Sequence, residues 1–278
     1  MHAFAANRHA VDAVQAPHAR YERGLSRVFI TGASSGLGEA LARHYAAAGA
    51  TLGLVARREA PMRDLAASLP GQHQVYVVDV AEPARLAEAA AHFCATVGLP
   101  DVVIANAGVS VGTLTEHAED IDAFERVLRT NLLGMVATFQ PFVELMRGRG
   151  QGRLVGIASV AGIRGLPGAG AYSASKAGAL AYLESLRVEL HGSGVKVVTV
   201  APGYIHTPMT AVNPYPMPFI LPAAEAARRI ARVVERGERY AVVPWQMAWV
   251  ARVLGILPRW LFDRLFAHAG RKPRGLPL

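Results

Sequence analysis

The most informative part of the sequence is Val28-Phe29-Ile30-Thr31-Gly32-Ala33-Ser34-Ser35-Gly36-Leu37-Gly38. A short apolar run leads into a glycine-rich turn, and the helix-forming residues 39–48 follow it. Glycines at such a place permit a tight turn and a close approach of backbone to phosphate. The start of a helix also offers free N–H groups and the positive end of its dipole. A plain glycine-rich turn is the alternative, while a P-loop is disfavoured because no Gly-Lys-Ser/Thr follows. The stretch predicts a strand, a nucleotide-binding turn and a helix.

The rest of the chain repeats this order of strand and helix. Apolar runs recur at residues 51–55, 74–78, 102–104, 154–157, 195–200 and 240–243. Helical patterns lie between these runs. One ends at about residue 69, one begins at residue 82, and three span residues 120–146, 172–191 and 222–237. Gly134 and Pro141 are expected to interrupt the pattern at 120–146. Such alternation predicts βαβ units and a parallel sheet covered on both faces. Right-handed crossovers then favour an α/β doubly wound sheet, the Rossmann fold. A chain of 278 residues suits a single domain of this kind.

Composition and charge narrow the classes of function. Apolar residues make up 52% of the chain and charged residues 18%, which is typical of a globular protein. Cys94 is the only cysteine, and no pair of histidines has the helical spacing of a zinc site, so we predict no disulfide and no metal. The net charge of +8 is scattered except at residues 271–274, so nucleic acid is not expected as a partner.

The two ends of the chain lie outside the predicted core. Residues 1–24 lack the apolar run of a secretory signal and are interpreted as a flexible extension. No apolar stretch reaches the roughly 20 residues of a transmembrane helix, so a cytoplasmic protein is expected. Residues 244–278 are an amphipathic helical extension that Pro258 divides into two helices. This extension could cap the substrate pocket, pack on a partner subunit or lie peripherally on a membrane.

The glycine pattern is Thr-Gly-x-x-x-Gly-x-Gly, and further motifs follow it in a fixed order. They are Asp79-Val80, Asn106-Ala107-Gly108, Asn131, Ser159, Tyr172-Ser173-Ala174-Ser175-Lys176, and Pro202-Gly203 with Thr207. In these motifs the chain resembles the short-chain dehydrogenase/reductase family from about residue 27 to 243. The resemblance implies a Rossmann-fold, NAD(P)-dependent oxidoreductase, with residues 25–243 as its domain. It also implies a homodimer or homotetramer formed through the helices at 120–146 and after Tyr172.

The end of the second strand bears on the choice of cofactor. Arg57 and Arg58 follow the strand where an acidic residue would bind the ribose hydroxyls of NAD. Guanidinium groups match a 2′-phosphate, so we predict that NADP(H) is preferred over NAD(H), with Arg57 the stronger candidate. The alternative is that both arginines are merely solvated. Many NADP-preferring relatives carry a basic residue before the middle glycine, where this chain has Ser35.

The predicted cofactor site combines these motifs. Its residues are Gly32, Ser34, Ser35, Gly36, Leu37, Gly38, Arg57, Arg58, Asp79, Val80, Asn106, Ala107, Gly108, Tyr172, Lys176, Pro202, Gly203 and Thr207. The family resemblance implies that Asp79 and Val80 flank the adenine, Lys176 holds the nicotinamide ribose and Thr207 contacts the carboxamide.

Tyr172 and Lys176 are four residues apart on a predicted helix, so both side chains project from one face. A nearby ammonium would stabilise the phenolate and lower the tyrosine pKa, which lets Tyr172 act as general acid or base. Ser159 at a strand end could hydrogen-bond the same substrate oxygen. The resemblance implies that Asn131 positions a water in a proton relay to Lys176. Asn131, Ser159, Tyr172 and Lys176 are the predicted catalytic residues of a hydride transfer between NADP(H) and a carbonyl/alcohol pair.

Two segments are expected to cover the substrate, residues 161–170 and residues 208–222. The second contains five prolines and several large apolar side chains, so an apolar carbonyl substrate is predicted, unless these side chains pack on a neighbouring subunit. A protein that binds NADPH as a regulator without turnover is the alternative function. Such a regulator would typically lack the tyrosine or the lysine, and this chain has both.

Overall fold

The computed structural model describes residues 27–276, so the prediction for residues 1–24 lies outside the described part of the chain. Seven strands form the main sheet: β1 (Arg27–Thr31), β2 (Thr51–Ala56), β3 (Gln74–Val77), β4 (Val102–Ala105), β5 (Gly152–Ile157), β6 (Val195–Pro202) and β9 (Tyr240–Val243). Every pairing is parallel, and the order is β3-β2-β1-β4-β5-β6-β9. The doubly wound Rossmann sheet predicted from the sequence is confirmed.

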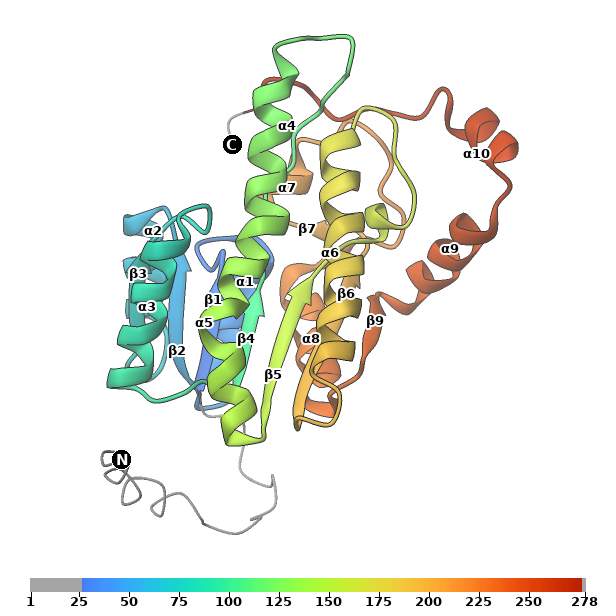
Figure 1. Cartoon of the computed structure of the whole chain (residues 1–278). Coiled ribbons are helices and arrows are strands. Elements are labelled where there is room, and N and C mark those ends of the chain that lie inside the picture. The colour runs from blue at the N-terminus through green and yellow to red at the C-terminus, as the bar shows by residue number, and fades with distance from the viewer. Residues whose placement is uncertain (1–26, 277–278) are drawn as a thin grey trace, which may run out of the picture.

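Helices cover both faces of the sheet (Figure 1). One face carries α1 (Gly36–Ala47), α2 (Glu59–Ser68) and α8 (Ala223–Arg236), and their apolar side chains share a buried cluster with β1 and β2. The other face carries α3 (Pro83–Thr96), α5 (Gly134–Arg149) and α6 (Gly170–Glu189), which bury a second cluster around Phe29, Phe93, Phe139 and Phe142. Strands buried from both sides explain why the runs in the sequence are continuously apolar rather than alternating.

The predicted helix at 120–146 is one continuous rod with a local change of winding. It consists of α4 (Asp120–Leu128), a π-helical turn (Arg129–Leu133) and α5. The expected interruptions at Gly134 and Pro141 are wrong, because both residues lie within α5. The irregularity lies just before Gly134, in the turn that contains Asn131. A π turn adds a residue to the helix and often occurs at functional sites.

Several other boundaries differ from expectation by a few residues. The first helix begins at Gly36 rather than residue 39, so the last glycines of the turn already belong to it. Helix α6 begins at Gly170, two residues before Tyr172. A second, two-stranded sheet of β7 (Ile205–His206) and β8 (Leu221–Pro222) was not expected; it closes the loop at 208–222, which also contains the short helix α7 (Pro208–Ala211).

Two helices follow the last strand, α9 (Trp245–Ile256) and α10 (Arg259–Phe266). Pro258 is the residue before α10, so the predicted division of the extension at this proline is confirmed. Both helices project from the side of the molecule that carries β9, and the chain after them runs back across the carboxyl ends of the strands toward α4 (Figure 1). No helix within residues 27–276 is both long and apolar enough to span a bilayer.

Candidate functional site

The glycine-rich turn lies at the carboxyl end of β1 and opens α1. Gly32 and Gly36 have left-handed φ angles of 70° and 60°. A Cβ at Gly38 would lie only 2.1 Å from the carbonyl oxygen of Gly32, so this helix position admits no side chain. Ser35 precedes α1 without a side-chain capping bond, which leaves the first N–H groups of the helix free of a side-chain cap. The turn therefore has the shape and the donors that a phosphate group requires.

Asn106 holds this turn from the neighbouring strand β4. Its Nδ2 donates to the carbonyl oxygens of Thr31 and Gly32, both at 3.1 Å. The hydroxyl of Thr31 accepts hydrogen bonds from the backbone N–H groups of Asn106 and Ala107. A Cβ at Gly32 would come within 2.7 Å of the Ala107 Cα, so the two loops are in direct contact. The motif at residues 106–108 thus fixes the position of the glycine-rich turn. Both the motif and the turn line the cleft described below.

The arginines after β2 lie at the adenine end of the predicted cofactor site. The Arg58 guanidinium donates to the Ser34 carbonyl and to the hydroxyls of Ser34 and Ser35, at 2.9–3.3 Å. Arg57 is half exposed, and its Nη1 lies 3.7 Å from an Asp79 carboxylate oxygen. Both guanidinium groups line the cleft. Arg58 thus brings a positive charge to Ser35, the position where the sequence lacks a basic residue.

Ser159, Tyr172 and Lys176 come together where β5 ends and α6 begins. The Lys176 Nζ donates to the Ile157 carbonyl at 2.8 Å and lies 5.8 Å from the centre of the Tyr172 ring. The Ser159 hydroxyl accepts from the Ala161 N–H at 3.1 Å. Lys176 and Ser159 are both buried. A phenol, an alcohol and an ammonium therefore converge on one place in the cleft.

The electrostatics of this group differ from the expectation that Lys176 lowers the pKa of Tyr172. Burial raises the Tyr172 pKa above its ordinary value, and the neighbouring Ser159 hydroxyl only partly opposes this effect. Burial also lowers the pKa of Lys176 to about 8. The reason is that the ammonium bonds the Ile157 carbonyl rather than the phenol oxygen, while both groups lose hydration. The phenol is thus held in its protonated form.

Asn131 projects from the π-helical turn and is fully buried. It exchanges two hydrogen bonds with the backbone of Val109, and its Nδ2 also donates to the Ser175 hydroxyl at 3.0 Å. Ser175 in turn donates to the Tyr172 carbonyl at 2.7 Å. Asn131 therefore ties the loop after β4 to the first turns of α6. It does not line the cleft itself, but it lies behind Gly108 on the Lys176 side.

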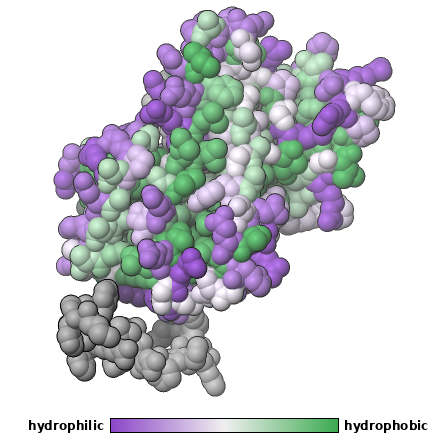
Figure 2. Space-filling view, viewed as in Figure 1, coloured by the Kyte–Doolittle hydropathy of each residue, from purple (hydrophilic) through white to green (hydrophobic). Residues whose placement is uncertain are grey.

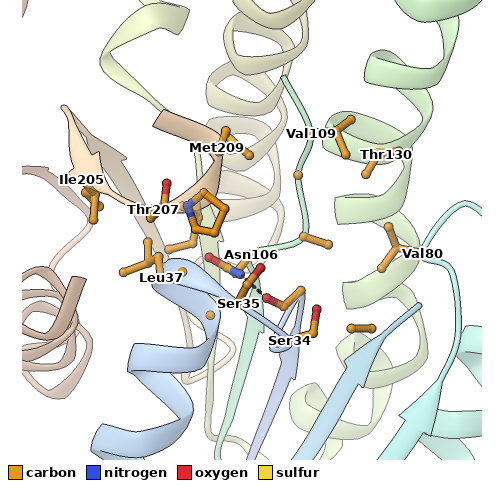
Figure 3. A pocket seen from close by; sticks show the side chains of 18 of the residues that line it. Ser34, Ser35, Leu37, Val80, Asn106, Val109, Thr130, Ile205, Thr207 and Met209 are labelled. Carbon is orange, nitrogen blue, oxygen red and sulfur yellow. Dashed lines mark hydrogen bonds between the residues drawn. The ribbon is translucent and has the colours of Figure 1, made fainter. Parts of the chain in front are cut away.

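A single cleft of about 310 Å³ contains the other predicted residues. Figure 3 shows Ser35 and Asn106 in its middle, with Thr207 and Met209 on one side and Val80 and Thr130 on the other. The cleft is lined by every predicted cofactor residue and by Ser159, Tyr172 and Lys176. Ten further residues also line it: Ala56, Val78, Val109, Thr130, Ile157, Ala158, Ile205, Pro208, Met209 and Thr210. Most of these ten residues are apolar and adjoin the motifs in sequence. They belong to no motif themselves, so the sequence contained no signal for them.

The segment after α10 is a feature that the motifs did not indicate. The Lys272 Nζ donates to the Met209 carbonyl at 2.8 Å, and the Pro273 carbonyl accepts from the Gly112 N–H at 2.9 Å. Arg274 forms an ion pair with Asp120, whose carboxyl pKa it holds below the ordinary value. We call residues 270–276 the C-terminal strap. The cluster of basic residues at 271–274 was visible in the sequence, but not its partners.

Comparison with known proteins agrees with this geometry. Residues 26–215 match the family described as short chain dehydrogenase. An uncharacterised oxidoreductase of Myxococcus xanthus is 36% identical over 87% of this chain and 96% of its own length. The 2-dehydro-3-deoxy-L-rhamnonate dehydrogenase (NAD(+)) of a Sphingomonas species is 36% identical over 65% of this chain and 72% of its own. The 11-beta-hydroxysteroid dehydrogenase 1A of Arabidopsis thaliana is 33% identical over 78% of this chain and 68% of its own.

A solved structure is similar over most of the chain. The crystal structure of a short-chain dehydrogenase from Streptomyces avermitilis matches with a TM-score of 0.70 at 26% sequence identity. The match covers 88% of this chain and 95% of that one. Sheet order, glycine-rich turn and sequence similarity all lead to one assignment. The chain belongs to the short-chain dehydrogenase/reductase family and is an oxidoreductase that uses a nicotinamide cofactor.

Proposed function

We propose that this protein transfers a hydride between NADP(H) and an apolar carbonyl/alcohol substrate, with Tyr172 as general acid and base. The observation that carries the proposal is that one cleft contains both the phosphate-binding turn and the group Ser159, Tyr172 and Lys176. The nicotinamide of the bound cofactor supplies or accepts the hydride. The residues of the chain bind the substrate and handle the proton.

The proton step follows from the state of the Tyr172 phenol. Because burial raises its pKa, the phenol is protonated at neutral pH and is ready to donate to a carbonyl oxygen. The Ser159 hydroxyl is close enough to the phenol to lower its pKa and can orient the same oxygen. In the reverse direction Tyr172 accepts the proton of the alcohol. Reduction should therefore keep its rate over the neutral range and fall only in alkali.

Lys176 and Asn131 are proposed to serve this step from the protein side. Lys176 is proposed to hold the cofactor ribose and to provide an ammonium near the Tyr172 ring, 5.8 Å from its centre, when the substrate and cofactor are bound. Asn131 is proposed to position the water of a proton relay to Lys176, in agreement with its place behind Gly108. Its hydrogen bonds to Val109 and Ser175 also fix the start of α6, so it positions Tyr172 and Lys176.

The proposed preference for NADP(H) depends on the two arginines after β2. Arg57 and Arg58 flank the part of the cleft formed by Ser34, Ser35 and Asp79. Arg58 supports the proposal because it supplies the charge that many NADP-preferring relatives place next to the middle glycine. The Sphingomonas relative is named for NAD(+), so membership of the family does not by itself decide the preference. Asp79 and Val80 are proposed to flank the adenine, and Thr207 to contact the carboxamide.

The proposed apolar substrate depends on the two covering segments. The names of the relatives include a hydroxysteroid and a sugar acid, so the substrate class must follow from this chain's own loops. Residues 208–222 bring Met209 into the cleft, and Tyr215 of the same segment packs edge to face on Tyr204. Such side chains exclude water from the reacting atoms. A small polar carbonyl with the best kcat/KM would contradict this proposal.

The test is to follow NADPH absorbance with a panel of aldehydes, ketones, quinones, keto-lipids and steroids. We expect oxidation of NADPH with an apolar member of the panel, and a loss of at least 100-fold in kcat for Tyr172→Phe without loss of NADPH binding. Tyr182→Phe, a partly buried tyrosine further along α6, is the matched control and should stay active. Tight NADPH binding with no turnover of any compound would favour a regulatory protein instead.

A further inference from the structure

Helix α9 is apolar on two opposite faces. Its inner face buries Met247 and Ala251 against Val160 and Ile163. Its outer face exposes Trp245, Trp249, Val253 and Ile256, with exposed fractions between 51% and 78%. The spacing of these four residues places them in one stripe along the helix. A helix that is apolar all around is usually buried in protein or in contact with lipid, so the outer stripe requires a partner.

Helix α10 continues the same surface with aromatic and basic side chains. Trp260 and Leu265 are 69% and 62% exposed. Arg252, Arg259 and Arg264 are exposed beside them, and none forms an ion pair with another residue of the described chain. Asp263 is the single acidic residue between positions 244 and 278. We call the exposed side chains of α9 and α10 the aromatic surface; Figure 2 shows hydrophobic and hydrophilic groups intermixed where these helices project.

A hollow of about 480 Å³ lies beside this surface, between β9 and α9. Apolar and aromatic side chains line it, with one guanidinium, that of Arg252. Trp249 and Ile256 belong to both the hollow and the outer stripe. An apolar recess with a cation at its side suits a molecule that has a hydrocarbon chain and an anionic head.

We propose that the aromatic surface binds the face of an anionic lipid bilayer. Tryptophan is favoured at the membrane interface because it presents an apolar ring and a polar N–H. Arginine forms strong hydrogen bonds with lipid phosphates and is attracted to a negative surface. A second copy of the chain is a poorer partner, since a symmetric contact would bring these arginines against each other. The proposal needs no turnover and is independent of the proposed substrate.

The helices that carry the aromatic surface also contact a residue of the cleft and one of the segments proposed to cover the substrate. The Arg164 guanidinium donates to the Leu257 carbonyl at 2.8 Å and lies 4.6 Å from the centre of the Phe262 ring. Met247 fills the space that a Cβ would need at Gly203, which lines the cleft. Lipid bound to the extension would therefore lie next to one of the segments that cover the substrate.

The chain itself carries the probe for the test, because its only three tryptophans are Trp245, Trp249 and Trp260. The full chain is mixed with vesicles of phosphatidylcholine, with and without 30% phosphatidylglycerol, and followed by tryptophan emission and by co-sedimentation. We expect a blue shift and pelleting with the anionic vesicles, and release by high salt. Either an unchanged emission or equal pelleting with neutral and anionic vesicles would overturn the proposal.

Two pairs of variants separate the apolar and the ionic contributions. Trp249→Ser with Ile256→Ser, and separately Arg252→Gln with Arg264→Gln, should each weaken binding to anionic vesicles roughly tenfold or more. Arg63→Gln with Arg236→Gln changes exposed arginines of α2 and α8, away from the aromatic surface, and should bind as the wild type does. NADPH binding of each variant shows that the fold is intact. A blue shift without vesicles that grows with protein concentration, together with faster sedimentation, would assign the surface to a second copy.

Discussion

At the scale of single residues, Lys176 places a cation in the interior of the protein. Its side chain is almost fully buried, and its one hydrogen bond among the described residues goes to the Ile157 carbonyl. Burial lowers its pKa from 10.5 to about 8. A lowered pKa of a base means that the charged form is less stable in the folded than in the unfolded chain. The difference between the two pKa values corresponds to a destabilisation of the folded chain by about 3 kcal/mol when the lysine is charged.

We therefore predict that Lys176→Met stabilises the fold while it removes activity. The gain in the free energy of unfolding should be about 1–3 kcal/mol at pH 7, since the loss of a donor to Ile157 offsets part of the effect. Below pH 8 the gain is complete, and it disappears as the pH rises toward 10.5, because the wild-type lysine is then neutral in both states. Urea unfolding at pH 7 and pH 10 measures this. Lys196→Met, at an exposed position of β6, should show no such pH dependence.

Arg57 and Arg58 support a second prediction at this scale. Replacing both by alanine should weaken NADPH binding roughly 10- to 100-fold, because each charge-assisted hydrogen bond to a phosphate contributes about 1.5–3 kcal/mol. NADH binding should change by less than about threefold. Titration of cofactor fluorescence compares the two, with Arg63→Ala, an exposed arginine of α2, as control. If NADH binding falls as much as NADPH binding, the arginines support the turn through Ser34 and Ser35 and do not select the phosphate.

At the scale of elements, the C-terminal strap connects parts of the chain that are far apart in sequence. It binds α4 through Asp120, the loop after β4 through Gly112, and α7 through Met209. A Cβ at Gly112 would lie 2.1 Å from the Lys272 carbonyl oxygen, so this loop glycine is needed for the contact. Since Met209 lines the cleft, the strap holds one wall of the cleft, where the substrate is proposed to bind.

Arg274→Ala should accordingly raise the KM for substrate by about 5- to 50-fold, while the Kd for NADPH stays within twofold. The reason is that the variant leaves Asp120 without its cation and loosens the strap, while the glycine-rich turn is untouched. Steady-state kinetics and cofactor titration together measure this, with Arg236→Ala on α8 as control. An equal loss of cofactor affinity would mean that the strap supports the whole fold rather than the substrate wall.

Some elements of the fold could be predicted from the sequence and others could not. Strands and helices of the sheet were predictable because each strand is apolar and each helix has a sheet to cover. The π-helical turn was not, because its cause is tertiary: Asn131 bonds Val109 and Ser175 from other parts of the chain. The small sheet of β7 and β8 has only two residues in each strand and is formed by loop closure, which leaves no periodicity to detect.

At the scale of the whole molecule, the face formed by α4, α5 and α6 remains apolar. Ile121, Leu133, Leu145 and Val188 are each at least half exposed. Figure 2 shows a band of hydrophobic side chains along this face. Helices α9 and α10 project to one side of these three helices (Figure 1). Exposed apolar bands of this kind often mark contacts with other protein chains.

We predict a homodimer or homotetramer that uses this face. Leu145→Asp with Val188→Asp would bury four charges in a symmetric contact and should reduce the sedimenting mass to that of a single chain. Ala67→Asp, at an exposed position of α2, should leave the assembly unchanged. Sedimentation velocity at several concentrations checks both. An unaltered mass of the double variant would exclude this face as the interface.

Local sequence patterns were enough to predict the sheet, the family and the motif residues that line the cleft. These patterns are apolar strands, glycines that a turn requires, and a tyrosine and lysine one helical turn apart. The folded chain alone shows that burial raises the Tyr172 pKa and that Arg58 reaches Ser35, because both depend on distances between separate elements. It also shows that the basic C-terminus folds back on α4 while the tryptophans before it stay exposed. Burial and ion pairing are properties of the packed chain, and residues adjacent in sequence can differ completely in both.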